Sequence, residues 1–307
     1  MPPASASPSP KGRVRVGPAG WSYADWVGMV YPARRSADFH EAGYLARYFD
    51  TIEINTSFYQ PLRPEISRRW VDLVSPNPNF LFTAKLWQRF THETGSSRED
   101  EAAFRAGLEP LADSGRLGAL LTQFPFSFHN TVENRTHLQS LIRQFEAYPL
   151  VVEVRHSTWN DQAFFHMLHE RGVGFCNIDQ PVIGRSMKPT ERVTAPVGYI
   201  RLHGRRYDTW FSDNQATPPE ERYNYLYSEQ ELEPWADRAR HIATHTRSTF
   251  VITNNHFQGK SIVNALELIH LLTGAKVDVP ESLRHHYPEL NEIASEPERE
   301  PTLFPEA

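Results

Sequence analysis

Eight short hydrophobic runs, nearly all ending in polar or charged residues, constrain what this chain can fold into. They cover residues 14–21, 51–59, 80–87, 118–124, 150–159, 173–179, 197–204 and 249–256. A stretch with helical spacing follows most of them. Eight strand–helix units within roughly 270 residues are typical of a single (β/α)8 TIM barrel, an α/β fold whose active sites lie at the carboxyl ends of the strands. The strand ends are therefore where we expect a ligand.

Alternation within the runs separates a polar from an apolar face, because successive strand side chains point to opposite sides. At 150–159, Val152 and Val154 share one face, while Glu153 and Arg155 share the other. We expect apolar faces to meet the helices and polar faces to line the barrel. The predicted interior set is Arg15, Glu53, Lys85, Gln123, Glu153, Arg155, Asp179, Arg201 and His203.

This interior set holds four permanent cations and three carboxylates. Buried charges need such a near balance, whereas barrel interiors usually hold Val, Ile and Leu. A charged interior is costly to fold. It favours a functional site over the alternative, a purely structural ion-pair network.

Composition and charge limit the classes of protein. The 307 residues can form one large core, and the net charge of −5 comes from residues 276–307, with eight acidic and three basic side chains. We therefore divide the chain into a Pro/Ser/Ala-rich, disordered leader at 1–12, a barrel at 13–275 and an acidic, Pro/Glu-rich tail at 276–307. The remaining body is neutral and exerts no global attraction on nucleic acid.

The single cysteine excludes an internal disulfide and favours a reducing, cytoplasmic location. Cys176 and Ile178 fall on the apolar face of their run, opposite Asn177 and Asp179, so we expect Cys176 to pack inertly. The start of the chain does not read as a signal peptide, and no apolar stretch approaches the roughly 20 residues of a membrane span.

Helical spacing predicts helices after most strands, with no clear helix at 180–196. The expected helices are 38–49 with Asp38 as cap, 64–73, 99–112, 132–147, 161–170, 228–245 and 261–272. The irregular stretch 204–227 is too aromatic for simple disorder. We interpret it as a lid over the barrel mouth, or else as a structural hairpin on the rim. Its aromatic residues are Tyr207, Trp210, Phe211, Tyr223, Tyr225 and Tyr227.

Motifs along the whole barrel resemble one known family. They are Gly17–Trp21, Glu53–Tyr59, Phe82–Lys85, Gln123–Pro125, Glu153–His156, Arg201–Gly204, Tyr225–Tyr227 and Asn254–Asn255. In this order they resemble the YecE-like proteins, domain of unknown function 72. The chain departs from them at Asp179-Gln-Pro181, where a smaller central residue is expected. The resemblance implies a TIM barrel and no established reaction.

Four inward side chains are candidate catalytic groups: Glu153, His203, Glu53 and Lys85. A carboxylate beside cations stays ionised and can hold a hydroxyl, a metal or a proton. A desolvated Lys85 could act as a base or form a Schiff base, whereas nearby carboxylates would keep it charged for anion binding or charge compensation. His203 is the one histidine placed firmly inward, and a structural role is its alternative.

A wider set is expected to bind substrate. It comprises Arg155, Arg201, Asp179, Gln123, Asn55, Trp21, Tyr59, Trp159, Arg205, Tyr207, Asn254 and Asn255. The loops 204–206 and 254–261 follow strands seven and eight, the usual phosphate site in barrels. Gly259 and Lys260 at the start of the last helix favour an anion cradle there. Asn254 excludes a P-loop, and a cap at Ser261 is the structural alternative.

Metal and glycosidase chemistry find weaker support. Zinc needs three or more nitrogen or sulfur ligands, and the inward face offers one histidine. Magnesium on Glu53, Glu153 or Asp179 stays open because no spacing demands it. We therefore assign no metal ligands and leave the cofactor undetermined, with a divalent metal allowed. Glu53 and Glu153 could form a glycosidase pair, but the surrounding cations oppose a raised pKa on either acid.

These observations predict a cytoplasmic enzyme acting on an anionic, phosphate-bearing small molecule or nucleotide, with phosphoester hydrolysis as the favoured reaction. Arg155, Lys85, Arg201 and the loop 204–206 would bind charge, and Glu153 with His203 or Glu53 would move protons. One alternative is a metal-dependent nuclease or DNA-repair barrel that stacks exposed bases. Another is a non-catalytic barrel that binds a ligand or partner. The oligomeric state is open.

Overall fold

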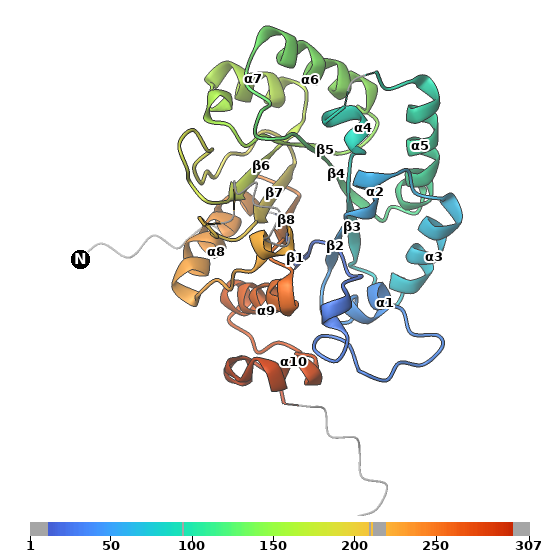
Figure 1. Cartoon of the computed structure of the whole chain (residues 1–307), viewed down its shortest axis with the longest axis vertical. Helices are drawn as coiled ribbons and strands as arrows, with labels where there is room; N and C mark the ends of the chain where they lie inside the picture. Colours follow the sequence, from blue (N-terminus) through green and yellow to red (C-terminus); the bar gives the residue numbers. More distant parts are fainter. Residues whose placement is uncertain (1–11, 94, 209, 211–218, 297–307) are drawn as a thin grey trace, which may run out of the picture.

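The computed structural model describes residues 12–93, 95–208, 210 and 219–296 (Figure 1). The leader at 1–11, Phe211 and the last eleven residues lie outside this range. Eight parallel strands form the centre of the molecule, as predicted. They are β1 Arg13–Pro18, β2 Thr51–Ile54, β3 Leu81–Lys85, β4 Leu117–Gln123, β5 Leu150–Glu153, β6 Gly174–Asp179, β7 Val197–Leu202 and β8 Ser248–Thr253.

The strands form one nearly closed barrel. Their order, β1-β8-β7-β6-β5-β4-β3-β2, places each strand beside its neighbours in the sequence. Only a single bridge between Ala19 and Glu53 is recorded between the β1 and β2 edges within the described chain, where Gly20 N donates to Glu53 O at 2.8 Å. This weak seam matters because the cavity described below extends toward it.

Helices surround the barrel (Figure 1). They are α1 Glu41–Leu45, α2 Thr56–Tyr59, α3 Pro64–Val74, α4 Gln88–Thr91, α5 Arg98–Asp113, α6 Val132–Gln144, α7 Gln162–Glu170, α8 Glu229–Ala243, α9 Lys260–Thr273 and α10 Glu281–His286. Short 3-10 turns occupy Ala24–Trp26, Ser157–Trp159, Pro219–Tyr223, Phe257–Gly259 and Pro288–Glu292. No helix crosses 180–196, as the sequence indicated.

Local sequence explains most helix boundaries. Ser97 and Ser228 each form a reciprocal capping box, with Asp100 and Glu231 respectively, which fixes the starts of α5 and α8. The first helix differs from its prediction: it begins at residue 41, because the side chain of His40, and not Asp38, accepts from a backbone N–H of its first turn.

Strand β6 is turned over relative to its prediction. Cys176 Sγ lies 3.8 Å from Glu153 Oε2, so Cys176 faces the barrel interior. Asn177 faces outward and bonds the segment 190–192, accepting from Thr190 Oγ1 and donating to Arg192 O. The reason is the missing helix: an irregular polar segment covers β6, and its backbone needs a polar partner on that face. Asp179 shares the outward side.

Arg15, also in the predicted interior set, lies away from the cavity. Its guanidinium donates to Ser248 Oγ at 3.0 Å and to Asn79 O at 3.1 Å. Ser248 is the first residue of β8, so Arg15 lies at the amino-terminal end of the barrel, opposite the strand ends that form the cavity.

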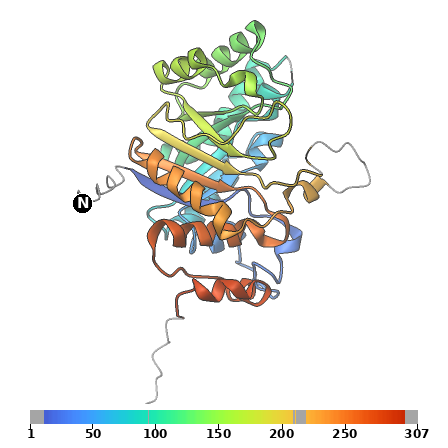
Figure 2. The same ribbon diagram turned by 90° about the vertical axis from the view of Figure 1, so that its left-hand side faces the viewer.

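The described chain continues past the expected barrel boundary at residue 275. Figures 1 and 2 place α10 next to α9, on the side away from the strands. Leu283 in α10 and Leu290 in the following turn are buried. Within the described residues, no helix is long and apolar enough to cross a membrane.

Candidate functional site

A cavity of about 570 Å³ lies at the carboxyl ends of the strands. Every strand except β6 supplies lining side chains from its carboxyl half or from the loop that follows it. The volume lies within the range of small-molecule sites, roughly 300–1,000 Å³. The site predicted at the strand ends therefore coincides with a cavity.

Arg201 forms the centre of the cavity floor. Its Nη2 lies 2.8 Å from Glu53 Oε1, and its Nη1 lies 2.7 Å from Glu153 Oε2. All three side chains are almost completely buried. A guanidinium offers its donors in a fixed planar fork, so one arginine can hold two carboxylates in place.

Tyr199 completes this floor, although the sequence analysis did not select it. Its hydroxyl lies 2.9 Å from Glu53 Oε2 and 2.8 Å from Thr83 Oγ1. The signal was present, because Tyr199 precedes Arg201 by two residues and so shares its inward face. It was not selected because an aromatic residue on a strand suggests packing, whereas here its hydroxyl forms hydrogen bonds.

Arg155 holds the other oxygen of Glu153, and His203 lies beside it. Arg155 Nε donates to Glu153 Oε1 at 3.0 Å, and His203 Nε2 lies 3.3 Å from the same atom. Burial acts to raise the pKa of Glu153, but Arg201 and Arg155 outweigh it and hold that pKa well below its usual range. Glu153 is therefore an ionised anchor at neutral pH.

His203 is neutral. Burial lowers its pKa to about 3, and Arg201 and Arg155 add to this effect. Asn254 Nδ2 lies 3.0 Å from His203 Nδ1, so that ring nitrogen accepts, whereas the buried Nε2 forms no hydrogen bond within the described structure. We name these six residues the inner network: Glu53, Glu153, Arg155, Tyr199, Arg201 and His203.

Lys85 is the unmatched charge of the cavity. Its Nζ lies 4.1 Å from the centre of the Phe58 ring. No carboxylate among the described residues forms an ion pair with it, since Glu53 and Glu153 are held by the arginines. Burial, reinforced by Arg201, lowers the pKa of Lys85 to about 7. Around these two carboxylates there are thus two arginines and a lysine.

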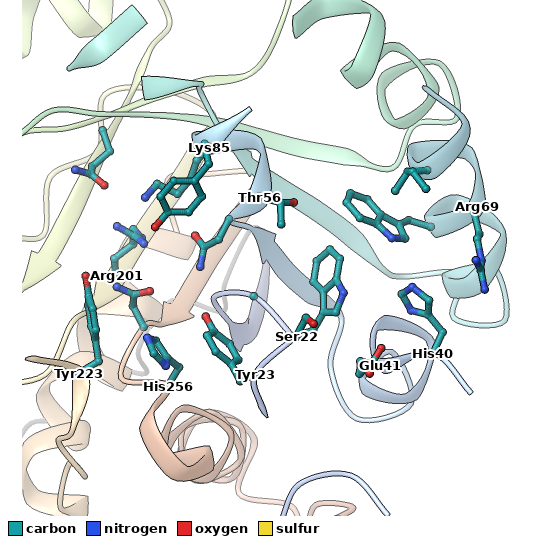
Figure 3. A pocket seen from close by; sticks show the side chains of 18 of the residues that line it. Ser22, Tyr23, His40, Glu41, Thr56, Arg69, Lys85, Arg201, Tyr223 and His256 are labelled. Atoms are coloured by element: carbon teal, nitrogen blue, oxygen red, sulfur yellow. The ribbon is translucent and has the colours of Figure 1, made fainter. Parts of the chain in front are cut away.

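Aromatic rings form one wall of the cavity (Figure 3). The Tyr23 and His256 rings stack with centroids 4.3 Å apart, and Tyr223 lies 5.0 Å from His256. Tyr59 also lines the cavity and is 67% exposed. The wall offers flat surfaces for a ring-bearing ligand.

Asn55 supplies an unused polar atom to the lining. Its Oδ1 is buried without a hydrogen-bond partner in the described structure. An unsatisfied buried acceptor is costly and calls for an explanation. A donor on a bound ligand would satisfy it.

The cavity has a side branch toward the β1–β2 seam. Trp21 and Trp70 meet edge to face there, with centroids 4.9 Å apart. His40, Glu41 and Arg69 lie at its outer end (Figure 3). Sequence reasoning selected only Trp21 in this branch, because the others come from helices α1 and α3 or their starts.

Half of the sixteen predicted catalytic and substrate-binding residues line the cavity. Lys85, Arg155, Arg201, Gln123, Asn55, Trp21, Tyr59 and Asn254 line it. Glu53, Glu153 and His203 do not line it and belong to the inner network, where Glu53 and Glu153 each contact the lining residue Arg201.

Five residues predicted to bind substrate do not line the cavity: Trp159, Asn255, Tyr207, and the pair Asp179 and Arg205 described below. Trp159 is fully buried, stacks on Phe128 and donates from Nε1 to its carbonyl, so it packs in the core. Asn255 is buried and bonds Tyr225 O. Tyr207 is 55% exposed and is absent from the cavity lining.

Asp179 and Arg205 form a separate ionic group outside the cavity. Arg205 Nε lies 2.9 Å from Asp179 Oδ2, and its Nη1 lies 3.0 Å from Glu231 Oε1. Tyr225 donates to Glu231, and the Tyr227 hydroxyl accepts from Gly204 N beside this group. Burial raises the pKa of Asp179 despite Arg205. We name the set Asp179, Arg205, Tyr225, Tyr227 and Glu231 the outer network.

The predicted anion cradle at 254–261 is already occupied by the chain itself. Gln258 N donates to Asp25 Oδ2 at 2.6 Å. Lys260 Nζ bonds Asn224 Oδ1, and Ser261 is buried. Arg206 from the other predicted loop pairs with Asp208. The unmatched positive charge therefore lies at Lys85 and not in these loops.

Two aromatic residues of the stretch 204–227 reach the site. Trp210 lies 5.8 Å from the Arg155 guanidinium and 6.0 Å from the His203 ring, while Tyr223 lines the cavity. Tyr225 and Tyr227 instead belong to the outer network. Within the described residues, no three His, Cys, Asp or Glu side chains are grouped so that they could hold a metal ion.

A parallel α/β barrel with a cationic cavity at its strand ends defines the class of protein. The DUF72 model, described as a protein of unknown function, matches residues 15–288, and the chain belongs to this family. The YecE-like resemblance is thereby confirmed.

Known relatives are similar to this protein over most of its length. The UPF0759 protein YunF of Bacillus subtilis is 28% identical over 274 residues, covering 84% of this chain and 94% of YunF. A DUF72 protein structure from Thermotoga maritima is 32% identical with a TM-score of 0.72, covering 84% of this chain and 98% of that one. One from Enterococcus faecalis is 25% identical with a TM-score of 0.74, covering 88% and 98%. These descriptions carry no activity.

Proposed function

We propose that the protein is an enzyme that binds a small phosphate-bearing molecule in the central cavity and exchanges protons with it at Lys85. Hydrolysis of a phosphoester is the reaction class we propose first. The observation that carries the proposal is the unmatched cation: Lys85 lines the cavity, and neither of the carboxylates beside it is free to pair with it.

An anion would correct this imbalance. Arg155 reaches the lining with an 18% exposed side chain, and Lys85 and Arg201 line the same cavity. A bound phosphate would act on Lys85 as an opposite charge, which favours the protonated amine and raises its pKa. Anion binding is therefore expected to proceed with proton uptake near neutral pH.

Lys85 also suits acid–base work. A group transfers protons best when its pKa lies near the working pH, and that of Lys85 is about 7. Glu153 and His203 do not fit this role in the same way, because both are held in one protonation state by their surroundings. In this proposal they position Arg155 and Arg201, and Lys85 moves the proton.

The aromatic wall favours a ring-bearing ligand such as a mononucleotide within this class. Tyr23 stacks on His256, Tyr223 lies tilted against the His256 ring, and Tyr59 presents an exposed ring. Base–aromatic stacking contributes about 1–3 kcal/mol per base. The same wall would serve the nuclease alternative, for which short single-stranded DNA is the discriminating ligand.

A thermal-shift screen tests the proposal. Phosphorylated sugars and mononucleotides are compared with their dephosphorylated counterparts, and with short single-stranded DNA, on the wild type, Arg155→Gln and Lys85→Met. Arg206→Gln is the matched control, because Arg206 pairs with Asp208 outside the cavity. A ligand at 100 times its Kd adds about 2.7 kcal/mol, which is a shift of several degrees.

We expect a phosphorylated compound to stabilise the wild type and the control but neither cavity variant, and the wild type to release phosphate from it. Equal stabilisation by the dephosphorylated compound would contradict the anion site. Binding without turnover would leave a non-catalytic barrel, and stabilisation by DNA alone would favour the nuclease.

A further inference from the structure

We propose that Lys85 is a nucleophile whose Nζ forms an imine with aldehydes or 2-oxo acids that carry an anionic group. This activity goes beyond the proton transfer proposed above, and it rests on the same anion site. The starting point is the position of the amine, which lines the cavity with no ion-pair partner among the described residues.

The surroundings of Lys85 disfavour its charged form. Burial disfavours the protonated amine, and Arg155 and Arg201 place two permanent positive charges around the same cavity; these effects outweigh the attraction of the Phe58 ring face for the cation. Neutral amines are the attacking species in imine formation, and burial or a neighbouring cation is how proteins keep a lysine neutral. Its pKa of about 7 agrees with this arrangement.

The same arginines select the carbonyl compound. A phosphate or carboxylate bound at Arg155 would hold the other end of a small molecule near Nζ, since both groups line one cavity. The Asn55 Oδ1 that lacks a partner could then accept from a hydroxyl on the bound compound. An anionic aldehyde therefore suits this site better than a neutral one.

The reaction balances without an added oxidant or reductant. The Nζ lone pair attacks the carbonyl carbon and gives a carbinolamine. One amine proton passes to the carbonyl oxygen in that step, and loss of the resulting hydroxyl with the one remaining N–H proton forms the C=N bond and releases one water molecule. Lys85 then holds the substrate as an imine, and protonation of that imine makes an electron sink for the adjacent carbon.

Reductive trapping tests the inference on the full-length protein. Pyridoxal 5′-phosphate serves as the anionic aldehyde, pyridoxal as its neutral counterpart, and glyoxylate as a small 2-oxo acid. Borohydride converts each imine to a stable amine that peptide mass spectrometry locates. The chain has only five lysines, so assignment is direct, and the exposed Lys188 reports ordinary reactivity.

We expect labelling at Lys85 at least about tenfold faster than at Lys188, since an ordinary lysine with a pKa near 10.4 is almost fully protonated at neutral pH. The rate at Lys85 should level off above about pH 7. Lys85→Arg should lose this adduct, and inorganic phosphate should slow it. Labelling of Lys85 no faster than of Lys188 would overturn the inference.

The two proposals fail in different ways. If phosphorylated ligands stabilise the protein but no adduct forms at Lys85, only the proposal of imine formation is contradicted. If pyridoxal labels Lys85 as fast as its phosphate ester, and inorganic phosphate gives no protection, the amine is reactive but the anion site of the proposed function falls.

Discussion

The inner and outer networks are both built from arginines, carboxylates and tyrosine hydroxyls, but they differ in the sign of their excess charge. In the inner network and its neighbour Lys85, three cations surround Glu53 and Glu153. In the outer network one cation, Arg205, serves two carboxylates. The excess positive charge of the inner network faces a cavity, whereas the excess negative charge of the outer network is offset by tyrosine hydroxyls. Ion pairs at strand ends therefore do not mark a ligand site by themselves.

The pKa shifts follow the same division. The pKa of Glu153 is held well below its usual range, whereas that of Asp179 is raised. Both carboxyls are buried, and burial is the largest influence on each. Two arginines overcome it at Glu153, but one shared arginine does not at Asp179. The direction of the pKa shift thus follows the number of arginines around each carboxyl, since burial acts in the same sense on both.

The largest expected effect separates the two carboxylates by stability. Glu153→Gln should lower the free energy of unfolding by about 3–5 kcal/mol, because it leaves Arg201 buried with half of its compensation. Asp179→Asn should cost less than about 2 kcal/mol, since the raised pKa of Asp179 means that the fold disfavours its charged form. Urea unfolding of both variants at neutral pH measures the contrast. Equal losses of unfolding free energy in the two variants would contradict the predicted contrast.

Lys85 should leave a signature in the pH dependence of stability. Its folded pKa of about 7 lies below the value near 10.4 of an unfolded lysine, so the unfolded chain binds more protons between these values. The free energy of unfolding should therefore rise with pH above 7, by up to about 1.4 kcal/mol per unit from this group. Lys85→Met should remove that rise, and a profile shared by both proteins would show that Lys85 is not the source.

Acid should destabilise the inner network through Glu153. The folded pKa of this carboxyl is depressed, so its contribution is complete above the unfolded value near 4.3 and is lost as the pH falls toward the folded value. Glu153→Gln should reduce the slope of unfolding free energy with pH below about 5. Unfolding curves between pH 3 and 6 measure this difference, with Asp179→Asn as the control that should not flatten the slope.

Two tyrosine hydroxyls give a smaller contrast. Tyr199→Phe should cost about 1–2 kcal/mol, because Glu53 Oε2 loses a donor while fully buried. Tyr225→Phe should cost under about 1 kcal/mol, because the more exposed Glu231 keeps Arg205 and the α8 cap. A reversed order would show that the outer network carries more of the stability.

The smallest effect on stability is expected at Tyr59. Tyr59→Ala should change the free energy of unfolding by less than about 0.5 kcal/mol, since the side chain is mostly exposed. It should nevertheless weaken binding of a mononucleotide several-fold through the loss of stacking, while a sugar phosphate binds as before. Titration calorimetry with both ligands separates the two cases.

The sequence predicted the barrel and most of the floor because strand alternation is a local property. Glu53, Lys85, Glu153 and Arg201 reach the site through their parity on regular strands. Strand β6 broke the rule because an irregular segment covers its outer face and makes Asn177 the buried polar partner there. Covering segments are tertiary features that alternation within one strand does not contain.

Other parts of the site required the folded chain. The sequence placed anion binding in the loops 204–206 and 254–261, but Asp25 and Asn224 use donors of the second loop. In the first loop Arg205 pairs with Asp179 and Arg206 with Asp208. It also missed Tyr199, because a tyrosine within a hydrophobic run suggests a core residue and not an inward hydrogen-bonding group. Residue type and spacing identify polar groups, whereas their pairing depends on neighbours from other elements.

The most direct test of the account is an NMR titration of the lysine ε-methylene groups, with and without inorganic phosphate. Five lysines make the spectrum assignable, and Lys85→Arg identifies the signal of interest. The account predicts one signal that titrates near pH 7 and moves to higher pH when phosphate binds. The account is contradicted if every lysine titrates near its ordinary value of about 10.4, or if phosphate leaves the Lys85 signal unchanged. Lys85 would then not be an unpaired cation in an anion-binding cavity.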